Sequence, residues 1–163
     1  MLTVLQELYA HQAWADARQW GAILGHEPAR LDSDLFARLV HLHGAQHVWL
    51  ARWQGSPVLF PVPGDFQDLS ALLAFAQDVQ LRSTAFRSGL TQADLERPLD
   101  YRDLHGHPWS QPLSEMMLHV ALHSQYHRGQ QATRLRALGA AMPPTDLVVW
   151  QRLGRPGAAW PEP

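Results

Sequence analysis

Apolar residues recur at helical spacing along four long stretches of this chain, and turn-forming residues separate the stretches. In the first stretch, Leu5, Leu8 and Trp20 contribute to a loose helical periodicity. The predicted helices cover residues 3–24, a segment that begins after Asp32 or Ser33 and ends at Gly55, residues 71–89, and a segment from Leu113 or Ser114 to Leu138. Four amphipathic helices joined by connections of mixed length favour an all-α fold, a four-helix bundle.

The segments between these helices carry residues that end helices and form turns. Residues 25–28 are expected to break the first helix, and the prolines within residues 57–64 predict an extended connection. Residues 98–112 predict a short irregular or β-like excursion before the fourth helix, and residues 146–152 a short terminal helix. A chain of this length fits a single domain, residues 1–163.

Composition and charge narrow the classes to which the chain can belong. Hydrophobic residues make up 46% and charged residues 17%, as is ordinary for a globular domain. A formal net charge of -2 argues against a nucleic-acid partner and against attraction to an anionic membrane. The chain has no cysteine, which excludes disulfides and thiolate metal sites.

The distribution of apolar residues also bears on location. No apolar run approaches the ~20 residues that a membrane-spanning helix needs. The segment that begins at Met1 has no basic leader and is interrupted by polar residues, unlike a signal peptide. We therefore expect a cytoplasmic protein that makes no membrane contact.

Histidine is the residue type whose distribution points to chemistry. Six of the ten histidines lie in two short windows, His41, His43 and His47 in the second predicted helix and His119, His123 and His127 in the fourth. Residues four positions apart lie one above the other on a helix, so neighbouring imidazoles of the second window can converge on one ion. Histidine is the commonest metal ligand. We expect this row to face the bundle interior, where unpaired imidazoles would be costly.

A less specific interpretation competes with the metal site. A histidine pair at this spacing is, by itself, more often a surface feature or a hydrogen-bonded core feature. The second histidine window shifts the balance toward a metal. No Glu follows His123, so the pair differs from the His-Glu-x-x-His arrangement of zinc proteases. A third ligand must come from another helix, and periodicity alone leaves His41, His43 and His47 open for that position.

The fourth predicted helix carries the most specific motif of the chain. The segment His123-Ser-Gln-Tyr-His127-Arg128-Gly129-Gln130 is similar to the His-x-x-x-His-Arg-Gly-Gln signature of the DinB/YfiT-like metalloprotein superfamily. Residues 40–53 resemble that family's second-helix motif, in which a His precedes a Trp or Tyr by eight residues. Weaker matches follow in the same order at Trp14-Ala15-Asp16, Leu138-Gly139 and Asp146. The resemblance therefore spans nearly the whole chain.

The resemblance implies a four-helix bundle with a three-histidine site for a divalent metal. Carried over to this chain, the ligands are His41, His123 and His127. His119, His43 and His47 would then surround the site or line its pocket without binding the metal. Gln46 departs from the family pattern, because many relatives carry an acidic residue five positions after the second-helix His.

Several neighbours of the histidines carry predictions of their own. Arg128 is interpreted as a helix-surface ion-pair partner, and Gln130 as a hydrogen-bond partner of a ligand imidazole. Gly129 costs about 1 kcal/mol relative to Ala inside a helix, which close packing of a neighbouring helix would explain. His105 and His107 are expected to be loop residues.

The tryptophans are expected to serve packing. Trp14, Trp20, Trp49 and Trp53 are predicted to lie in the bundle core or at an interface. The seven tryptophans of the chain could supply an apolar face through which two copies pair, so we expect a homodimer.

Three neutral imidazoles leave a divalent ion with positions open to a substrate. Zinc and nickel are the metals we expect first, with iron and manganese as alternatives. Some relatives in the superfamily are thiol-dependent transferases or isomerases, so the resemblance favours an enzyme that activates a low-molecular-weight thiol for S-transfer to a small molecule. Candidates for moving protons are His119, His43 and Tyr126, among which the sequence does not choose. The alternatives are a metal-dependent hydrolase that uses metal-bound water and a non-enzymatic, stress-associated metal-binding module.

Overall fold

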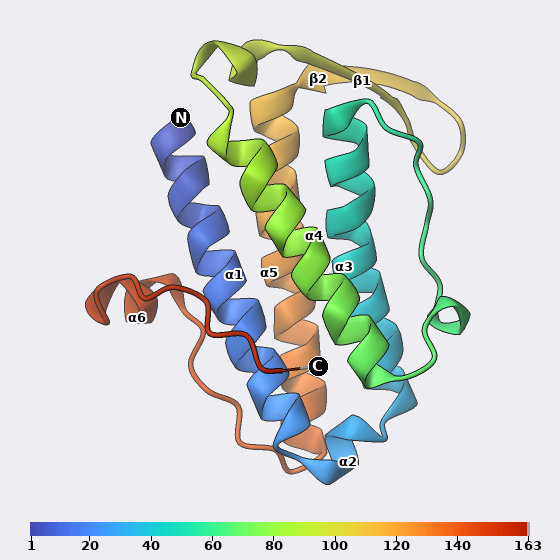
Figure 1. Cartoon of the computed structure of the whole chain (residues 1–163), viewed down its shortest axis with the longest axis vertical. Coiled ribbons are helices and arrows are strands. Elements are labelled where there is room, and N and C mark those ends of the chain that lie inside the picture. The colour runs from blue at the N-terminus through green and yellow to red at the C-terminus, as the bar shows by residue number, and fades with distance from the viewer. Residues whose placement is uncertain (163) are drawn as a thin grey trace.

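The computed structural model describes residues 1–162, and its four long helices lie side by side (Figure 1). These helices are α1 (Leu2–Leu24), α3 (Ser33–Gln54), α4 (Leu69–Ser88) and α5 (Leu113–Ala137). The shorter elements are α2 (Glu27–Arg30), the 3-10 turns η1 (Pro63–Asp65) and η2 (Ala93–Glu96), the strands β1 (Pro98–Arg102) and β2 (Pro108–Pro112), and α6 (Leu147–Arg152). The predicted four-helix bundle with a β-like excursion before its last long helix is confirmed. Residue 163, which ends the range predicted to form one domain, lies outside the described part.

Aspartates begin two of the long helices. Asp32 accepts a hydrogen bond of 2.7 Å from the backbone N–H of Leu35 at the start of α3. Asp68 accepts one of 2.8 Å from the backbone N–H of Ala71 at the start of α4. Each carboxylate satisfies a backbone donor that has no partner inside its own helix.

Two predicted helix boundaries are confirmed, and a short helix that the sequence pattern did not predict follows the first of them. Residues 25–28 end α1 as predicted, and α2 begins among them at Glu27, with Pro28 in its first turn. Proline fits there since the first turn of a helix does not use its N–H groups. The fourth long helix begins at Leu113, directly after Pro112 and without a side-chain cap.

The β-like excursion is an antiparallel hairpin in which Leu99 pairs with Gln111 and Tyr101 with Trp109. Asp103 organises its loop, because Oδ1 accepts the backbone N–H groups of His105 and His107 at 2.8 and 2.9 Å. As predicted, both histidines lie outside the regular elements. The hairpin lies across the end of the bundle, beside the end of α3 (Figure 1).

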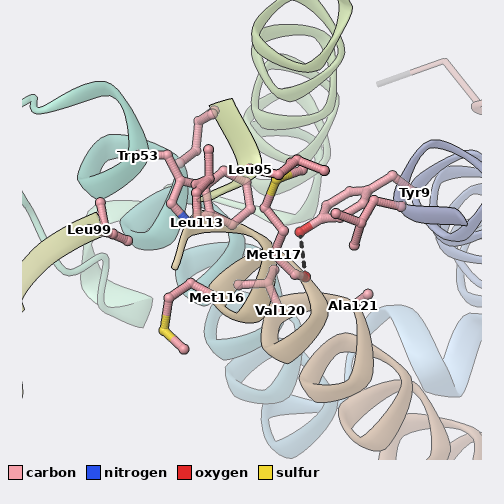
Figure 2. Packing of buried hydrophobic residues seen from close by; sticks show 11 residues of the cluster. Tyr9, Trp53, Leu95, Leu99, Leu113, Met116, Met117, Val120 and Ala121 are labelled. Carbon is pink, nitrogen blue, oxygen red and sulfur yellow. Dashed lines mark hydrogen bonds between the residues drawn. The ribbon is translucent and has the colours of Figure 1, made fainter. Parts of the chain in front are cut away.

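A large part of the core lies at the hairpin end of the bundle, where side chains from α1, α3 and α5 pack together (Figure 2). The hydroxyl of Tyr9 on α1 donates a hydrogen bond of 2.9 Å to the carbonyl oxygen of Met117 on α5. Burial raises the pKa of Tyr9 far above its ordinary value, so the hydroxyl remains a donor at any physiological pH.

The tryptophans mostly serve the interior. Trp14, Trp20 and Trp53 are at most 4% exposed, and Trp49 is half-buried. Trp109 on the hairpin is 52% exposed. The prediction that these residues pack the core is confirmed, whereas the idea that the tryptophans together form an exposed apolar face is wrong.

The helices α3 and α5 run in opposite directions along a shared seam (Figure 1). The rings of His41 and His127 are 4.3 Å apart at one point of the seam, and those of Trp49 and His119 are 5.4 Å apart at another. The seam therefore brings the two histidine windows of the sequence together. Within residues 1–162, no helix is long and apolar enough to cross a membrane.

Candidate metal centre

Three histidines from two helices meet at the seam between α3 and α5. His41 lies on α3, and His123 and His127 lie one turn apart on α5. The Nε2 atoms of His41 and His127 are 3.1 Å apart, and one nitrogen from each of the three rings lies within 4.8 Å of the others. Periodicity left three histidines of α3 open, and tertiary packing brings His41 to the pair on α5.

The histidine row of α5 lies at the edge of the bundle. His119 is exposed, and His123 and His127 are half-buried. The prediction that the row faces the interior is wrong, because a neighbouring stripe of α5, including Val120 and Ser124, occupies the interior instead. The position at the edge leaves the histidines accessible to small molecules.

Neighbouring groups determine the protonation of the cluster. Gln130 Oε1 lies 2.9 Å from His127 Nδ1, so this nitrogen carries the proton and Nε2 presents a lone pair toward His41. The predicted contact of Gln130 with a cluster imidazole is present. Burial and the neighbouring histidines lower the pKa of His123 to about 4. Burial, with a contribution from His41, also lowers the pKa of His127. Both rings are therefore neutral at pH 7.

This set of donors fits a divalent transition metal. Two nitrogens that share an ion at ~2.0–2.1 Å lie about 2.9–3.4 Å apart in octahedral or tetrahedral geometry, and the pair His41 and His127 is 3.1 Å apart. Neutral imidazoles suit zinc, nickel, copper and iron. No carboxylate of the described chain belongs to the cluster. An ion held here would keep its full charge.

His43 is fully buried and lies outside the cluster. Its Nε2 accepts a hydrogen bond of 3.0 Å from the indole N–H of Trp20, and its Nδ1 donates to Gln46 Oε1 at 3.1 Å. Burial lowers the pKa of His43, which keeps the ring neutral. Both ring nitrogens are occupied by these neighbours, so neither is free to exchange a proton with a substrate.

A buried polar network continues from His43 to α1 and α5. Gln46 Nε2 donates to Asp16 Oδ2 at 3.1 Å and lies 3.2 Å from Ser124 Oγ. Arg128 Nη1 donates to Asp16 Oδ1 at 2.9 Å, and both side chains are at most 3% exposed. Arg128 is therefore half of a buried ion pair, and its interpretation as a helix-surface residue is wrong.

Sequence reasoning missed this network. Asp16 stands among Ala13, Ala15 and Ala17 on a helix whose surroundings are apolar, and all four residues are buried. A charged residue in a run of small residues needs a buried partner. That signal could have pointed to the arginine that follows the second ligand histidine.

Two further candidates lie beside the cluster. The ring of His119 is 5.5 Å from that of His123, and partial desolvation in the seam lowers the pKa of His119. Tyr126 is 64% exposed, and its ring is 5.1 Å from that of His127. The structure thus places His119 in the seam and Tyr126 on the outer surface of α5.

The remaining residues of the two motifs lie outside the cluster. His47 Nδ1 lies 3.2 Å from an Arg82 guanidinium nitrogen on α4. A Cβ added at Gly129 would meet no atom within 4 Å. The expected close packing of a neighbouring helix against Gly129 is therefore wrong.

A cavity of about 550 Å³ lies along the seam beside the cluster. Helices α3 and α5, the hairpin, and the connection after α3 all contribute to its walls. The walls are mostly apolar and are formed by Val40, His41, Gly44, Ala45, Val48, Trp49, Arg52, Phe60, Pro61, Tyr101, Asp103, Leu104, Gln111, Met116 and His119. His41 joins the metal-ligand candidates to this space.

The fold and the site together indicate the class of this protein. It is a helical bundle with a candidate metal centre, in which two facing helices present three imidazoles beside an open cavity. The chain belongs to the DinB family, whose family model matches residues 1–155. Among solved structures, it is similar to a DinB-like protein from Bacillus cereus ATCC 10987, with 21% sequence identity and a TM-score of 0.52. That match covers 85% of this chain and 89% of the other, and it shows a shared fold. A search of curated proteins found no match.

Proposed function

We propose that this DinB-family protein binds a divalent transition metal through His41, His123 and His127 and activates a low-molecular-weight thiol for transfer to a small organic substrate. The observation that carries the proposal is the convergence of the three imidazoles, one of which, His41, lines an open cavity. A divalent ion held there would supply Lewis acidity, which lowers the pKa of a bound thiol or water. We propose zinc or nickel as the ion, with iron and manganese as alternatives.

A thiol fits this site better than a hydrolytic water does. Zinc proteases of the His-Glu-x-x-His type use a Glu as general base, and no carboxylate belongs to the cluster in residues 1–162. The nearest sequence counterpart, Gln46, is a buried amide bound to Asp16. A free thiol has a pKa of about 8.5 and can lose its proton with little assistance.

Among the candidates for moving protons, His119 fits best. It lines the cavity and lies one turn from His123. Partial desolvation lowers the pKa of His119, so its ring is neutral at pH 7 and one ring nitrogen has a lone pair for a proton. His43 has no free nitrogen, and Tyr126 does not line the cavity.

Elemental analysis of untagged protein tests the metal site. We expect near-stoichiometric metal in the parent and none in the double variant His123→Ala/His127→Ala. The matched control His105→Ala/His107→Ala removes two histidines from the hairpin loop and should retain the metal. A parent that stays metal-free after incubation with zinc, nickel and manganese would contradict the proposal.

Cobalt-loaded protein tests the thiol step. Addition of a thiol should produce a sulfur-to-cobalt charge-transfer band in the near ultraviolet, and S-conjugation by zinc-loaded protein should exceed that of a triple His→Ala variant at residues 41, 123 and 127. Equal conjugation rates across a panel of thiols and electrophiles would refute thiol activation. Ester or amide hydrolysis without a thiol response would support the hydrolase instead.

We also propose that the protein forms a homodimer. Exposed apolar side chains on α1 and α5, including Val4 and Leu122 at 55% and 60% exposure, support this proposal. Light scattering at micromolar protein concentrations should give the mass of two chains. The mass of a single chain would remove the proposal.

A further inference from the structure

Arg52 places a positive charge in the wall of the cavity between α3 and α5. It lies on α3, and among the cavity-lining residues it is the one arginine or lysine. Its guanidinium carbon lies 4.5 Å from the centre of the Trp49 ring and 5.1 Å from the centre of the Tyr101 ring. Its Nη2 donates a hydrogen bond of 2.8 Å to the carbonyl oxygen of Arg102. The two rings and this bond hold the guanidinium in the cavity wall.

Arg52 forms no salt bridge within residues 1–162, at a limit of 4.0 Å, and Asp103 acts on its charge only at longer range. The cavity also contains Asp103, but the carboxylate of Asp103 accepts the indole N–H of Trp109 at 3.1 Å and two backbone N–H groups of the hairpin loop. That carboxylate is committed to the hairpin, and the charge of Arg52 remains available to a ligand.

A second donor lies in the same wall. Gln111 lines the cavity, and its Oε1 accepts a hydrogen bond of 2.7 Å from the Tyr101 hydroxyl. This bond uses the oxygen of the amide and leaves its N–H groups available. Arg52 and Gln111 together offer N–H donors of the kind that bind a carboxylate.

Arg52 and the histidine cluster lie at two ends of one groove. Arg52 follows His41 by 11 residues, which is about three turns of helix and a rise of about 16 Å on the same side of α3. Across the seam, His119 and Met116 line the groove between these ends. Apart from His119, the wall between the two ends is apolar, with Ala45, Val48 and Met116 among its residues.

We propose that Arg52 binds an anionic group, a carboxylate in the simplest case, at the end of the substrate remote from the reacting atom. The substrate is then an elongated molecule with an apolar middle, whose reacting end lies at His41, His123 and His127. The place of that reacting end rests on the proposed function, whereas anion binding by Arg52 does not.

Binding to metal-free protein tests Arg52 on its own. Isothermal titration with linear alkanoates and with alkanols of equal chain length should show tighter binding of the carboxylates by about tenfold, the value of one charge-assisted hydrogen bond. Arg52→Gln should abolish the preference, and Arg52→Lys should retain part of it, because Lys keeps the charge and loses the planar fork. Arg102→Gln is the matched control, since Arg102 carries the same charge on the hairpin and does not line this cavity. Circular dichroism confirms that each variant is folded.

Zinc-loaded protein tests the span between the two ends. Among ω-mercaptoalkanoates of increasing length, affinity should peak where the chain reaches from the histidines to Arg52, and the peak should vanish in Arg52→Gln. A peak in affinity at one chain length would indicate that the thiol substrate carries the carboxylate that Arg52 binds. A carboxylate preference without such a peak would indicate that the electrophilic co-substrate carries it.

The outcomes separate this proposal from the proposed function. No carboxylate preference in the parent, or the same preference in Arg52→Gln, overturns the role of Arg52 whatever the histidines bind. A preference that depends on Arg52 in a protein that neither holds metal nor responds to thiols supports the anion site and overturns the thiol chemistry.

Discussion

At the scale of single residues, the amide nitrogen of Gln46 determines how the buried polar network is connected. Its amide nitrogen donates to the Asp16 carboxylate, while its oxygen accepts from His43. An amide supplies a donor and an acceptor at once, which an ionised carboxylate does not. The departure of this chain from the family pattern therefore lies in a buried network, and the histidine cluster holds no acid.

Replacing Gln46 with Glu should destabilise the protein in a pH-dependent way. The new carboxyl group would be buried beside Asp16, so its folded-state pKa would lie above the ordinary ~4.3. The deficit in the free energy of unfolding should be smallest below pH ~4, grow as the pH rises through the folded-state pKa, and reach about 2 kcal/mol at pH 7. Urea unfolding at a series of pH values measures it. The control Gln6→Glu, at an exposed position of α1, should show little change, and a flat pH profile of Gln46→Glu would argue against the network.

Tyr9 offers a second test among single residues. Tyr9→Phe removes the buried hydrogen bond to the Met117 carbonyl and keeps the ring in the core, so we expect a loss of about 1 kcal/mol in the free energy of unfolding. Tyr126→Phe makes the same change on an exposed side chain and should alter stability little. Equal effects of the two substitutions in urea unfolding would contradict this account.

At the scale of elements, a contact between two helix ends connects α3 to α5. Asp32 caps α3 and forms an ion pair with Arg134 in the last turn of α5. One carboxylate thus fixes the start of one helix against the end of another. Asp68 caps α4 in the same way, and none of the described ion pairs includes it.

Comparison of the two caps isolates the contribution of the ion pair. Asp68→Ala should cost about 1 kcal/mol, and Asp32→Ala the same plus up to about 1 kcal/mol for the partly exposed pair. The hydrogen bond from Arg134 lowers the pKa of Asp32, so the added stability exists above pH ~3.9 and is lost as the pH falls through the folded-state pKa. Thermal unfolding of both variants at pH 7 and pH 3 measures the difference. A difference that persists unchanged at pH 3 would contradict the ion-pair account.

The core and the histidine centre are separate at the scale of the whole molecule. The three histidines of the metal centre are exposed or half-buried at the edge of the bundle, whereas the apolar residues around Tyr9 and Trp20 are buried. We therefore expect the bundle to fold without an ion.

Removal of the metal tests this separation. After treatment with a chelator, we expect the helical circular dichroism signal to persist and the midpoint of thermal unfolding to fall by only the modest amount that loss of a ligand of the folded state causes. Loss of helical structure on chelation would instead identify a structural ion and favour the non-enzymatic metal-binding module.

Local patterns were enough to predict the four long helices and the hairpin segment, but not α2 or η1. Apolar periodicity and capping residues located the four long helices, and the turn-forming residues of 98–112 located the hairpin segment. The spacing of His123 and His127 predicted a pair on one side of α5, because four residues always make about one turn. These inferences depend on neighbours in sequence, which is the information a sequence carries directly.

Only the tertiary structure decided which side chains of different helices contact one another. Residues of α3 only two positions apart differ completely in surroundings, since His41 lies at the open seam and His43 is buried against Trp20. The rotation of a helix about its axis depends on how its side chains pack against other helices, and both sides of α3 carry apolar residues. For the same reason Arg128 was misjudged: its partner Asp16 lies 112 residues away on a helix that only the fold brings beside it.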